Sequence, residues 1–138
     1  MKVAIVTYGL INRRVALMLR ERGIEVVVFE DAELWADMAR EDGMECCQAL
    51  VSDPEADGPI QGTEVFVMMD VDALRVDRLA KSFRRKFPKA RIIASDVGIQ
   101  ELPYLETYTG EGHAMRVGQE ALARTVVSKI EEHMAKRS

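Results

Sequence analysis

Short apolar segments alternate with segments of helical periodicity from one end of the chain to the other, and this order constrains the fold most. After their first residue, the runs Lys2–Val6 and Glu25–Phe29 hold only Val, Ile, Ala and Phe, which is typical of strands buried on both faces of a parallel sheet. Between them, apolar residues recur at helical spacing up to Gly23, which suits a helix end. The order predicts an α/β fold: a doubly wound parallel sheet of about six strands with helices on both faces.

Four further strands and three longer helices complete the expected order. Asp31 and Asp72 are placed to cap the first two of these helices, and Pro88 ends the second. A short helical piece is expected at residues 100–105. The remaining strands are expected at residues 44–50, 64–69, 90–95 and 114–117. The apolar stripes of the three helices are Leu34, Trp35, Met38 and Ala39; Val76, Leu79, Phe83 and Phe87; and Leu122, Val126, Ile130 and Met134.

Composition excludes several classes of protein. A formal net charge of −4 and a pI near 5.3 argue against nucleic-acid binding, and the basic cluster at residues 84–91 suits a solvated helix end. No apolar run approaches the ~20 residues of a membrane span, so we expect a cytoplasmic chain without direct membrane insertion. The adjacent Cys46 and Cys47 are poor disulfide partners, and neither lies at zinc-like spacing from another ligand. Residues 1–138 contain no linker and are expected to form one domain.

The turn after the first strand is where a dinucleotide-binding fold carries G-x-G-x-x-G. Ligands of open parallel sheets bind beyond the carboxyl ends of the strands, and the helix N-terminus that follows holds phosphate. Here only the middle glycine is present, and a side chain where φ must be positive costs about 1–2 kcal/mol, or roughly tenfold in affinity. The residues of this turn are Thr7, Tyr8, Gly9, Leu10, Ile11 and Asn12. The motif is therefore weakened, and Arg13 and Arg14 are either phosphate partners that offset the loss or exposed helix residues.

An acid ends the second strand, at the position that binds ribose hydroxyls in a dinucleotide site. Glu30 lies 21 positions after Gly9 and is followed by Asp31. A carboxylate there accepts hydrogen bonds from a free 2′-hydroxyl and repels a 2′-phosphate. The position favours NAD or an adenosine nucleotide over NADP, although a solvent-facing strand end gives the same pattern.

The chain as a whole resembles the N-terminal, Rossmann-like lobe of RCK domains, also called TrkA-N or KTN domains. The resemblance is carried by "VAIVTYGLINRRVALMLRERGIEVVVFE", by the Asp70-Val71-Asp72 turn and long helix of "TEVFVMMDVDALRVDRLAKSFRRKFPKARIIAS", and by "HAMRVGQEALARTVVSKIEEHM". It implies a non-catalytic regulatory domain that binds NAD or NADH, with ATP, ADP or AMP as alternatives. It also implies a homodimer or higher homo-oligomer that gates a membrane potassium channel or transporter, peripheral to the membrane through that partner.

The resemblance also assigns site residues by position. Gly9 would contact phosphate, Glu30 ribose, Asp53 the adenine region and Asp70 the ligand. The chain departs from the family at Thr7 and Asn12, at Met69, where a small polar residue is usual, and at Ser95, where arginine is common. If these changes make the site degenerate, no cofactor binds.

Three other functions compete with nucleotide sensing. A dehydrogenase would need a substrate wall with an acid–base residue, and a single sheet in 138 residues leaves no room for one. A phospho-acceptor receiver domain would need acids at the end of the first strand, where Thr7 and Tyr8 stand. The serious alternative is an interaction module, which is a dimerisation or docking domain that has kept the fold and closed the site.

Overall fold

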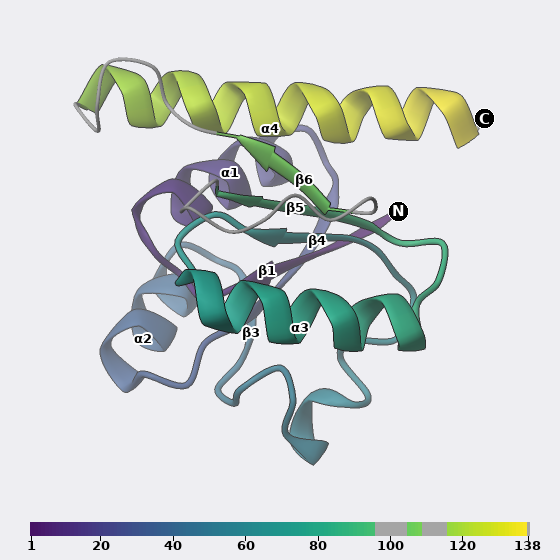
Figure 1. Ribbon diagram of the computed structural model, residues 1–138. Helices are drawn as coiled ribbons and strands as arrows, with labels where there is room; N and C mark the ends of the chain where they lie inside the picture. Colours follow the sequence, from purple (N-terminus) through teal and green to yellow (C-terminus); the bar gives the residue numbers. More distant parts are fainter. Residues whose placement is uncertain (96–104, 109–115, 138) are drawn as a thin grey trace.

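Six parallel strands form one sheet at the centre of the molecule. The computed structural model describes residues 1–95, 105–108 and 116–137 (Figure 1). The strand order is β3-β2-β1-β4-β5-β6, so the chain winds outward from β1 in one direction and from β4 in the other. The strands are β1 Lys2–Val6, β2 Glu25–Phe29, β3 Glu45–Cys47, β4 Thr63–Met68, β5 Arg91–Ser95 and β6 Leu105–Tyr108. This order is that of a Rossmann-like fold, and the expected doubly wound sheet is confirmed.

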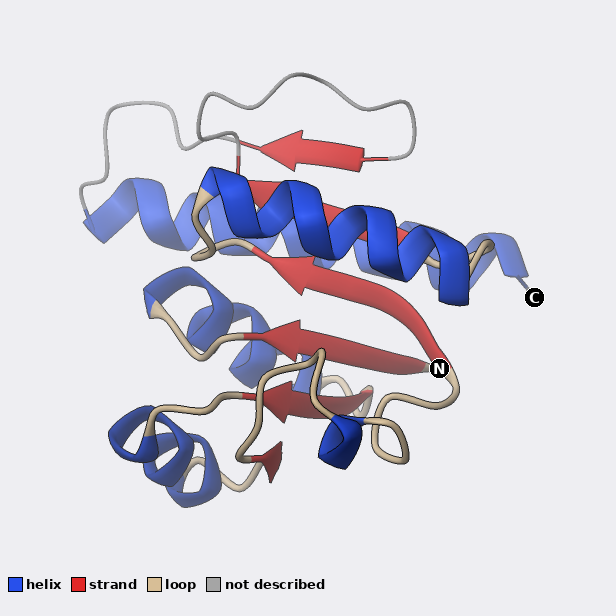
Figure 2. Ribbon diagram, turned by 60° about the horizontal axis from the view of Figure 1, so that its bottom comes forward, coloured by secondary structure: helices blue, strands red, loops and turns tan. Residues whose placement is uncertain are grey.

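Helices cover both faces of this sheet (Figure 2). Apolar residues of α1, α2 and α4 pack on one face in one core cluster, and those of α3 and of residues 49–62 pack on the other. The helices are α1 Leu10–Glu21, α2 Glu33–Glu41, α3 Ala73–Lys86 and α4 Arg116–Arg137, with a 3₁₀ turn at Pro54–Ala56. Among the described residues, no helix is long and apolar enough to cross a membrane.

Strand β1 shows why the central strands read as uninterrupted apolar runs. Val3 and Ile5 contribute to the core on the α1 side, whereas Ala4 and Val6 contribute to the core on the α3 side. All four are buried because successive side chains of a strand point to opposite faces and both faces are covered.

Three of the four expected helix ends are confirmed and one is wrong. Helix α3 ends at Lys86, with Phe87 as its C-cap directly before Pro88. Gly23 has φ +72° just after α1, a conformation that glycine adopts without a steric cost. Asp72 caps α3 by accepting a hydrogen bond from the Arg75 N–H at 3.0 Å. Asp31 does not cap α2: the N-cap residue is Ala32, and the carboxylate of Glu30 accepts the hydrogen bond of its N–H group.

The inner face of α2 also differs from the expected apolar stripe. Of the expected residues, Ala39 is buried together with Ala36, and Met38 packs against the same core, whereas Leu34 is 71% exposed and Trp35 is 37% exposed. Small alanines let the helix axis lie close to the sheet, and the larger apolar residues of the first turn then lie outside the core.

The C-terminal third contains the other errors of sequence reasoning. Of the strand expected at residues 114–117, residues 114–115 lie outside the described part of the chain and residues 116–117 begin α4; the sixth strand is Leu105–Tyr108, so its predicted place is wrong. Of the short helix expected at residues 100–105, residues 100–104 lie outside the described part of the chain and Leu105 begins β6. Leu105–Tyr108 reads Leu-Glu-Thr-Tyr, which lacks an apolar-polar alternation, so only the β-favouring Thr107 and Tyr108 indicate a strand there.

Candidate functional site

The predicted site lies where the strand order changes direction. Between β1 and β4 the chain diverges to opposite halves of the sheet, and in open α/β sheets ligands bind at this switch point. The turn after β1 and the turn after β4 meet there, so the structure brings the Gly9 turn and Asp70 together. The Gly9 turn and Asp70, which the sequence assigned to one site, therefore lie together at this edge of the sheet.

Thr7 occupies the backbone conformation of the first glycine in the dinucleotide motif. Its φ is +68°, the one positive value for a residue other than glycine in the described part of the chain. The left-handed region costs roughly 1–2 kcal/mol for a residue with a Cβ, and a β-branched side chain suits it poorly. Its Oγ1 is also buried without a hydrogen-bond partner among the described residues. The turn thus keeps the shape of the motif at an energetic cost.

Asn12 ties the ends of β1 and β4 together. Its fully buried side chain donates from Nδ2 to the carbonyl oxygens of Val6 and Thr7, both at 2.9 Å. Its Oδ1 accepts a hydrogen bond from the Met69 N–H at 3.0 Å. Because both donor hydrogens and the acceptor are used, Asn12 fixes the geometry of the edge, and Met69 lies buried beneath it.

Asp70 places a carboxylate at the N-terminus of α1. Its Oδ1 accepts a hydrogen bond from the Ile11 N–H at 3.2 Å, and its Oδ2 accepts one from the Asn12 N–H at 2.7 Å. Asp70 is an exposed residue, but desolvation of its carboxylate between the two turns raises its pKa, and these two N–H groups oppose that rise. Backbone N–H groups at a helix N-terminus are the groups that bind phosphate in dinucleotide sites. In this structure the chain supplies its own anion to them.

Glu30 is held in a similar way. The residue is 7% exposed, its Oε1 accepts a hydrogen bond from the Tyr8 N–H at 2.9 Å, and its Oε2 accepts one from the Ala32 N–H at 3.1 Å. Each carboxylate oxygen is therefore engaged with the backbone of the turns that flank it. The expected bond to ribose hydroxyls stays a prediction.

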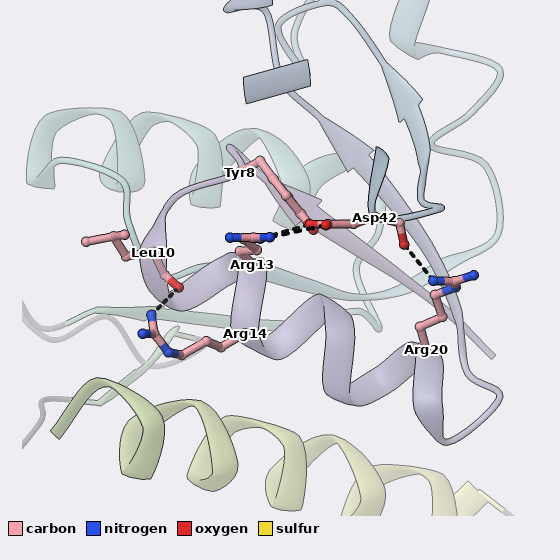
Figure 3. Close-up of polar contacts among 6 residues, drawn as sticks. All are labelled: Tyr8, Leu10, Arg13, Arg14, Arg20 and Asp42. Carbon is pink, nitrogen blue, oxygen red and sulfur yellow. Dashed lines mark hydrogen bonds and ion pairs between the residues drawn. The ribbon is translucent and has the colours of Figure 1, made fainter. Parts of the chain in front are cut away.

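The side chain of Tyr8 points toward Asp42 and Arg13 and forms a polar cluster with them (Figure 3). Its hydroxyl donates to Asp42 Oδ2 at 2.6 Å, and Arg13 contacts the same carboxylate through Nε at 2.9 Å and Nη2 at 3.2 Å. Burial, followed by the hydrogen bond to Asp42, raises the pKa of Tyr8, and the Arg13 guanidinium lowers the pKa of Asp42. The Arg13 guanidinium is thus paired with Asp42 in this structure.

Sequence reasoning missed Asp42. Its side chain joins the Tyr8–Asp42–Arg13 cluster, and its carbonyl oxygen accepts a hydrogen bond from Arg20 Nη1 at 2.6 Å. In the sequence Asp42 is marked only by its place directly before Gly43, at the end of α2. An acid at a helix end is common and does not by itself indicate a site. Arg14, the other proposed phosphate partner, donates to the carbonyl oxygen of Leu10 in its own helix at 3.0 Å (Figure 3).

The remaining predicted residues lie at the same edge with different surroundings. Asp53 Oδ2 accepts a hydrogen bond from the Leu50 N–H at 3.0 Å and so closes its own loop. Asp31 and Leu10 are exposed. Within the described ranges, no group of three His, Cys, Asp or Glu could hold a metal ion, and Cys46 and Cys47 are free thiols whose pKa burial raises.

Comparison with known proteins supports the fold. No protein-family model matches the sequence, and no curated protein matches it. Yeast methylglyoxal/isovaleraldehyde reductase, solved in complex with NADPH, superimposes with a TM-score of 0.52 and 12% identity over 99% of this chain and 54% of the reductase. A short-chain dehydrogenase/reductase superfamily protein from Agrobacterium tumefaciens with bound NAD gives a TM-score of 0.45 and 18% identity over 92% of this chain and 44% of that protein. This chain spans about half the length of these proteins, and the likeness to the yeast reductase establishes a Rossmann-like fold.

Proposed function

We propose that this chain is a non-catalytic regulatory domain that acts through contacts with other polypeptides, and that its own carboxylates close its nucleotide site. One observation carries the proposal: the Asp70 carboxylate is bound to the N–H groups of Ile11 and Asn12 at the N-terminus of α1. A Rossmann-like domain that no longer binds phosphate can still bind other polypeptides through its surface, because the same fold serves many unrelated functions.

The electrostatic cost of phosphate binding supports this proposal. A pyrophosphate would have to displace Asp70 from the two N–H groups, and the carboxylate would then stay near it because the turn after β4 is fixed by Asn12. Two like charges about 4 Å apart near a protein surface repel by about 4 kcal/mol, which is about a thousandfold in affinity. The loss is larger than the roughly tenfold effect expected from Thr7 alone.

The absence of catalysis is part of the same proposal. The carboxylates of Glu30 and Asp70 are engaged with backbone N–H groups, and the hydroxyl of Tyr8 is directed to Asp42. None of these three groups is left to transfer a proton to a substrate at this edge. His133 of the described part lies on α4, and it is not one of the residues of the turns after β1, β2 and β4.

A second candidate is an adenine-nucleotide sensor like the RCK or TrkA-N domains, acting as a homodimer on a potassium channel or transporter. The positive φ of Thr7 favours it, because the backbone keeps the dinucleotide turn even where the glycine is lost. The oligomer, the transport partner and NAD or NADH as ligand stay predictions of this candidate.

Thermal unfolding with and without nucleotides separates the two candidates. We expect flat melting curves for NAD, NADH, NADP, ATP, ADP and AMP at millimolar concentration. A ligand at a hundred times its Kd would add about 2.7 kcal/mol and raise the melting temperature on the order of 10 °C, and such a shift would overturn the proposal. Asp70→Ala should gain a shift with ADP. The matched control is Asp72→Ala, which also removes an acidic helix cap and should stay flat.

A further inference from the structure

Large apolar side chains gather at one edge of the sheet. In the described part of the chain, the exposed ones all follow the carboxyl end of a strand within a few residues: Leu10 after β1, Leu34 and Trp35 after β2, Leu50 after β3 and Leu74 after β4. Because these strands are parallel, they all end at the same edge of the sheet, where the arrowheads lie in Figure 2.

The first turn of α2 is the densest part of this edge. Leu34 and Trp35 are adjacent and exposed, and Ala36 and Ala39 already attach the helix to the sheet. Leu34 and Trp35 are therefore not needed to attach α2 to the core. Exposed apolar patches on a soluble domain mark sites that contact another molecule.

The charge of the residues around Leu34 and Trp35 indicates the charge of the molecule that this surface would bind. Between residues 29 and 39 the sequence holds four acids, Glu30, Asp31, Glu33 and Asp37, and no base, and Asp37 pairs with Arg40. Asp31 and Glu33 flank the exposed apolar pair, are themselves exposed, and form no ion pair with any described residue. The surface formed by Asp31, Glu33, Leu34 and Trp35, called here the α2 edge, is therefore both apolar and acidic.

We propose that the α2 edge binds a Lys/Arg-rich segment of another polypeptide that carries apolar anchor residues. This inference deepens the proposed function by giving the partner its chemistry. The apolar anchors would cover Leu34 and Trp35, and the cations would pair with Asp31 and Glu33. Complementary charge of this kind speeds encounter and excludes acidic partners.

A second copy of the chain fits this surface less well. A two-fold dimer through the α2 edge would place acid against acid, since each protomer presents the same patch. The basic residues at and just after the end of α3 lie at the opposite edge of the sheet, shortly before β5 begins. They are Arg84, Arg85, Lys86 and Lys89. Docking of these residues on the α2 edge of another copy would be head-to-tail and would give a ring or an open chain, not a two-fold dimer.

Trp35 gives the experiment a direct signal, because it is the single tryptophan of the chain. The full chain is titrated at low salt with a synthetic amphipathic peptide of Leu and Lys, and the emission of Trp35 is followed. We expect a shift to shorter wavelength, saturation, and weaker binding as salt is raised. A Leu and Glu peptide of the same pattern should give no shift.

A matched pair of charge reversals locates the site. Asp31→Lys with Glu33→Lys should raise the Kd for the Leu and Lys peptide at least tenfold. Glu25→Lys with Glu45→Lys makes the same change in net charge at exposed residues that begin β2 and β3, at the opposite edge, and should change it less than twofold. Equal effects of the two double variants, or no effect of the first, would overturn the inference. So would a concentration-dependent Trp35 shift without peptide, because it would assign the surface to self-association.

The outcome is separable from that of the nucleotide experiment. A nucleotide shift in the wild type together with peptide binding at the α2 edge would overturn the closed site and keep this surface. Flat nucleotide curves together with no peptide binding would overturn the surface and keep the closed site.

Discussion

The side chain of Asp70 fills the space that a side chain at Gly9 would need. A Cβ placed on Gly9 would lie 2.5 Å from the Cβ of Asp70 and 2.8 Å from its Oδ2. In a dinucleotide site the middle glycine leaves room for phosphate; in this chain it leaves room for a carboxylate of the same protein. Gly9 and Asp70 are thus energetically coupled, because a side chain added at Gly9 would collide with that of Asp70.

Gly9→Ala should destabilise the fold by about 1–3 kcal/mol, because an added methyl group in a filled space forces a shift of its neighbours. The contact is with the Asp70 side chain next to its backbone, so rotation about one bond does not relieve it. Urea unfolding measures the loss. In Asp70→Gly the same alanine should cost less, and the double-mutant cycle should show a coupling of at least about 1 kcal/mol. Additive effects would contradict the closure of the turn by Asp70.

Thr7→Gly should stabilise the protein although it deletes a side chain. Glycine adopts φ +68° without the roughly 1–2 kcal/mol that a residue with a Cβ loses there, and the variant removes a buried hydroxyl without a described partner. The greater freedom of glycine in the unfolded chain offsets about 0.5–1 kcal/mol of this gain. We expect a net gain of about 1 kcal/mol by urea unfolding.

The control for Thr7→Gly is the reverse change at a similar backbone conformation. Gly23 has φ +72° and open space where a Cβ would be, so Gly23→Ala isolates the backbone effect. It should lose about 1 kcal/mol. If Thr7→Gly lost stability while Gly23→Ala behaved as expected, the Thr7 side chain would have a favourable contact that outweighs its backbone strain.

The sequence predicted β1, β2 and α3 well, because each of these elements depends on local pattern. The apolar runs of β1 and β2 are buried on both faces, and the cap of α3 lies three residues from its N–H partner. The contact of Asp70 with the N-terminus of α1 could not be predicted in this way. Asp70 meets Asn12 across 58 positions, and their meeting depends on how β4 lies beside β1, including the register shift between Lys2 and Val3. No local pattern contains that information, so the same residues read equally well as an open ligand site.

Tyr8 gives the last prediction, a dependence of stability on alkaline pH. Burial and the hydrogen bond to Asp42 raise the pKa of Tyr8 above its usual value of 10.0. The unfolded chain releases this proton near the usual value, whereas the folded chain keeps it to higher pH. The unfolded state then binds fewer protons than the folded state, so the free energy of unfolding falls as pH rises past about 10.

Tyr8→Phe isolates this contribution. At neutral pH the variant should be less stable by about 1.5–3 kcal/mol, because it loses a hydrogen bond to a charged carboxylate, while Arg13 still pairs with Asp42. Urea unfolding of both proteins between about pH 8 and pH 11 should then show the two curves converging, since only the wild type loses the Tyr8 contribution. The other two tyrosines, Tyr104 and Tyr108, are common to both proteins and cancel in the difference. Curves that stay parallel across this range would mean that the Tyr8 hydroxyl is not held by Asp42 in the folded protein.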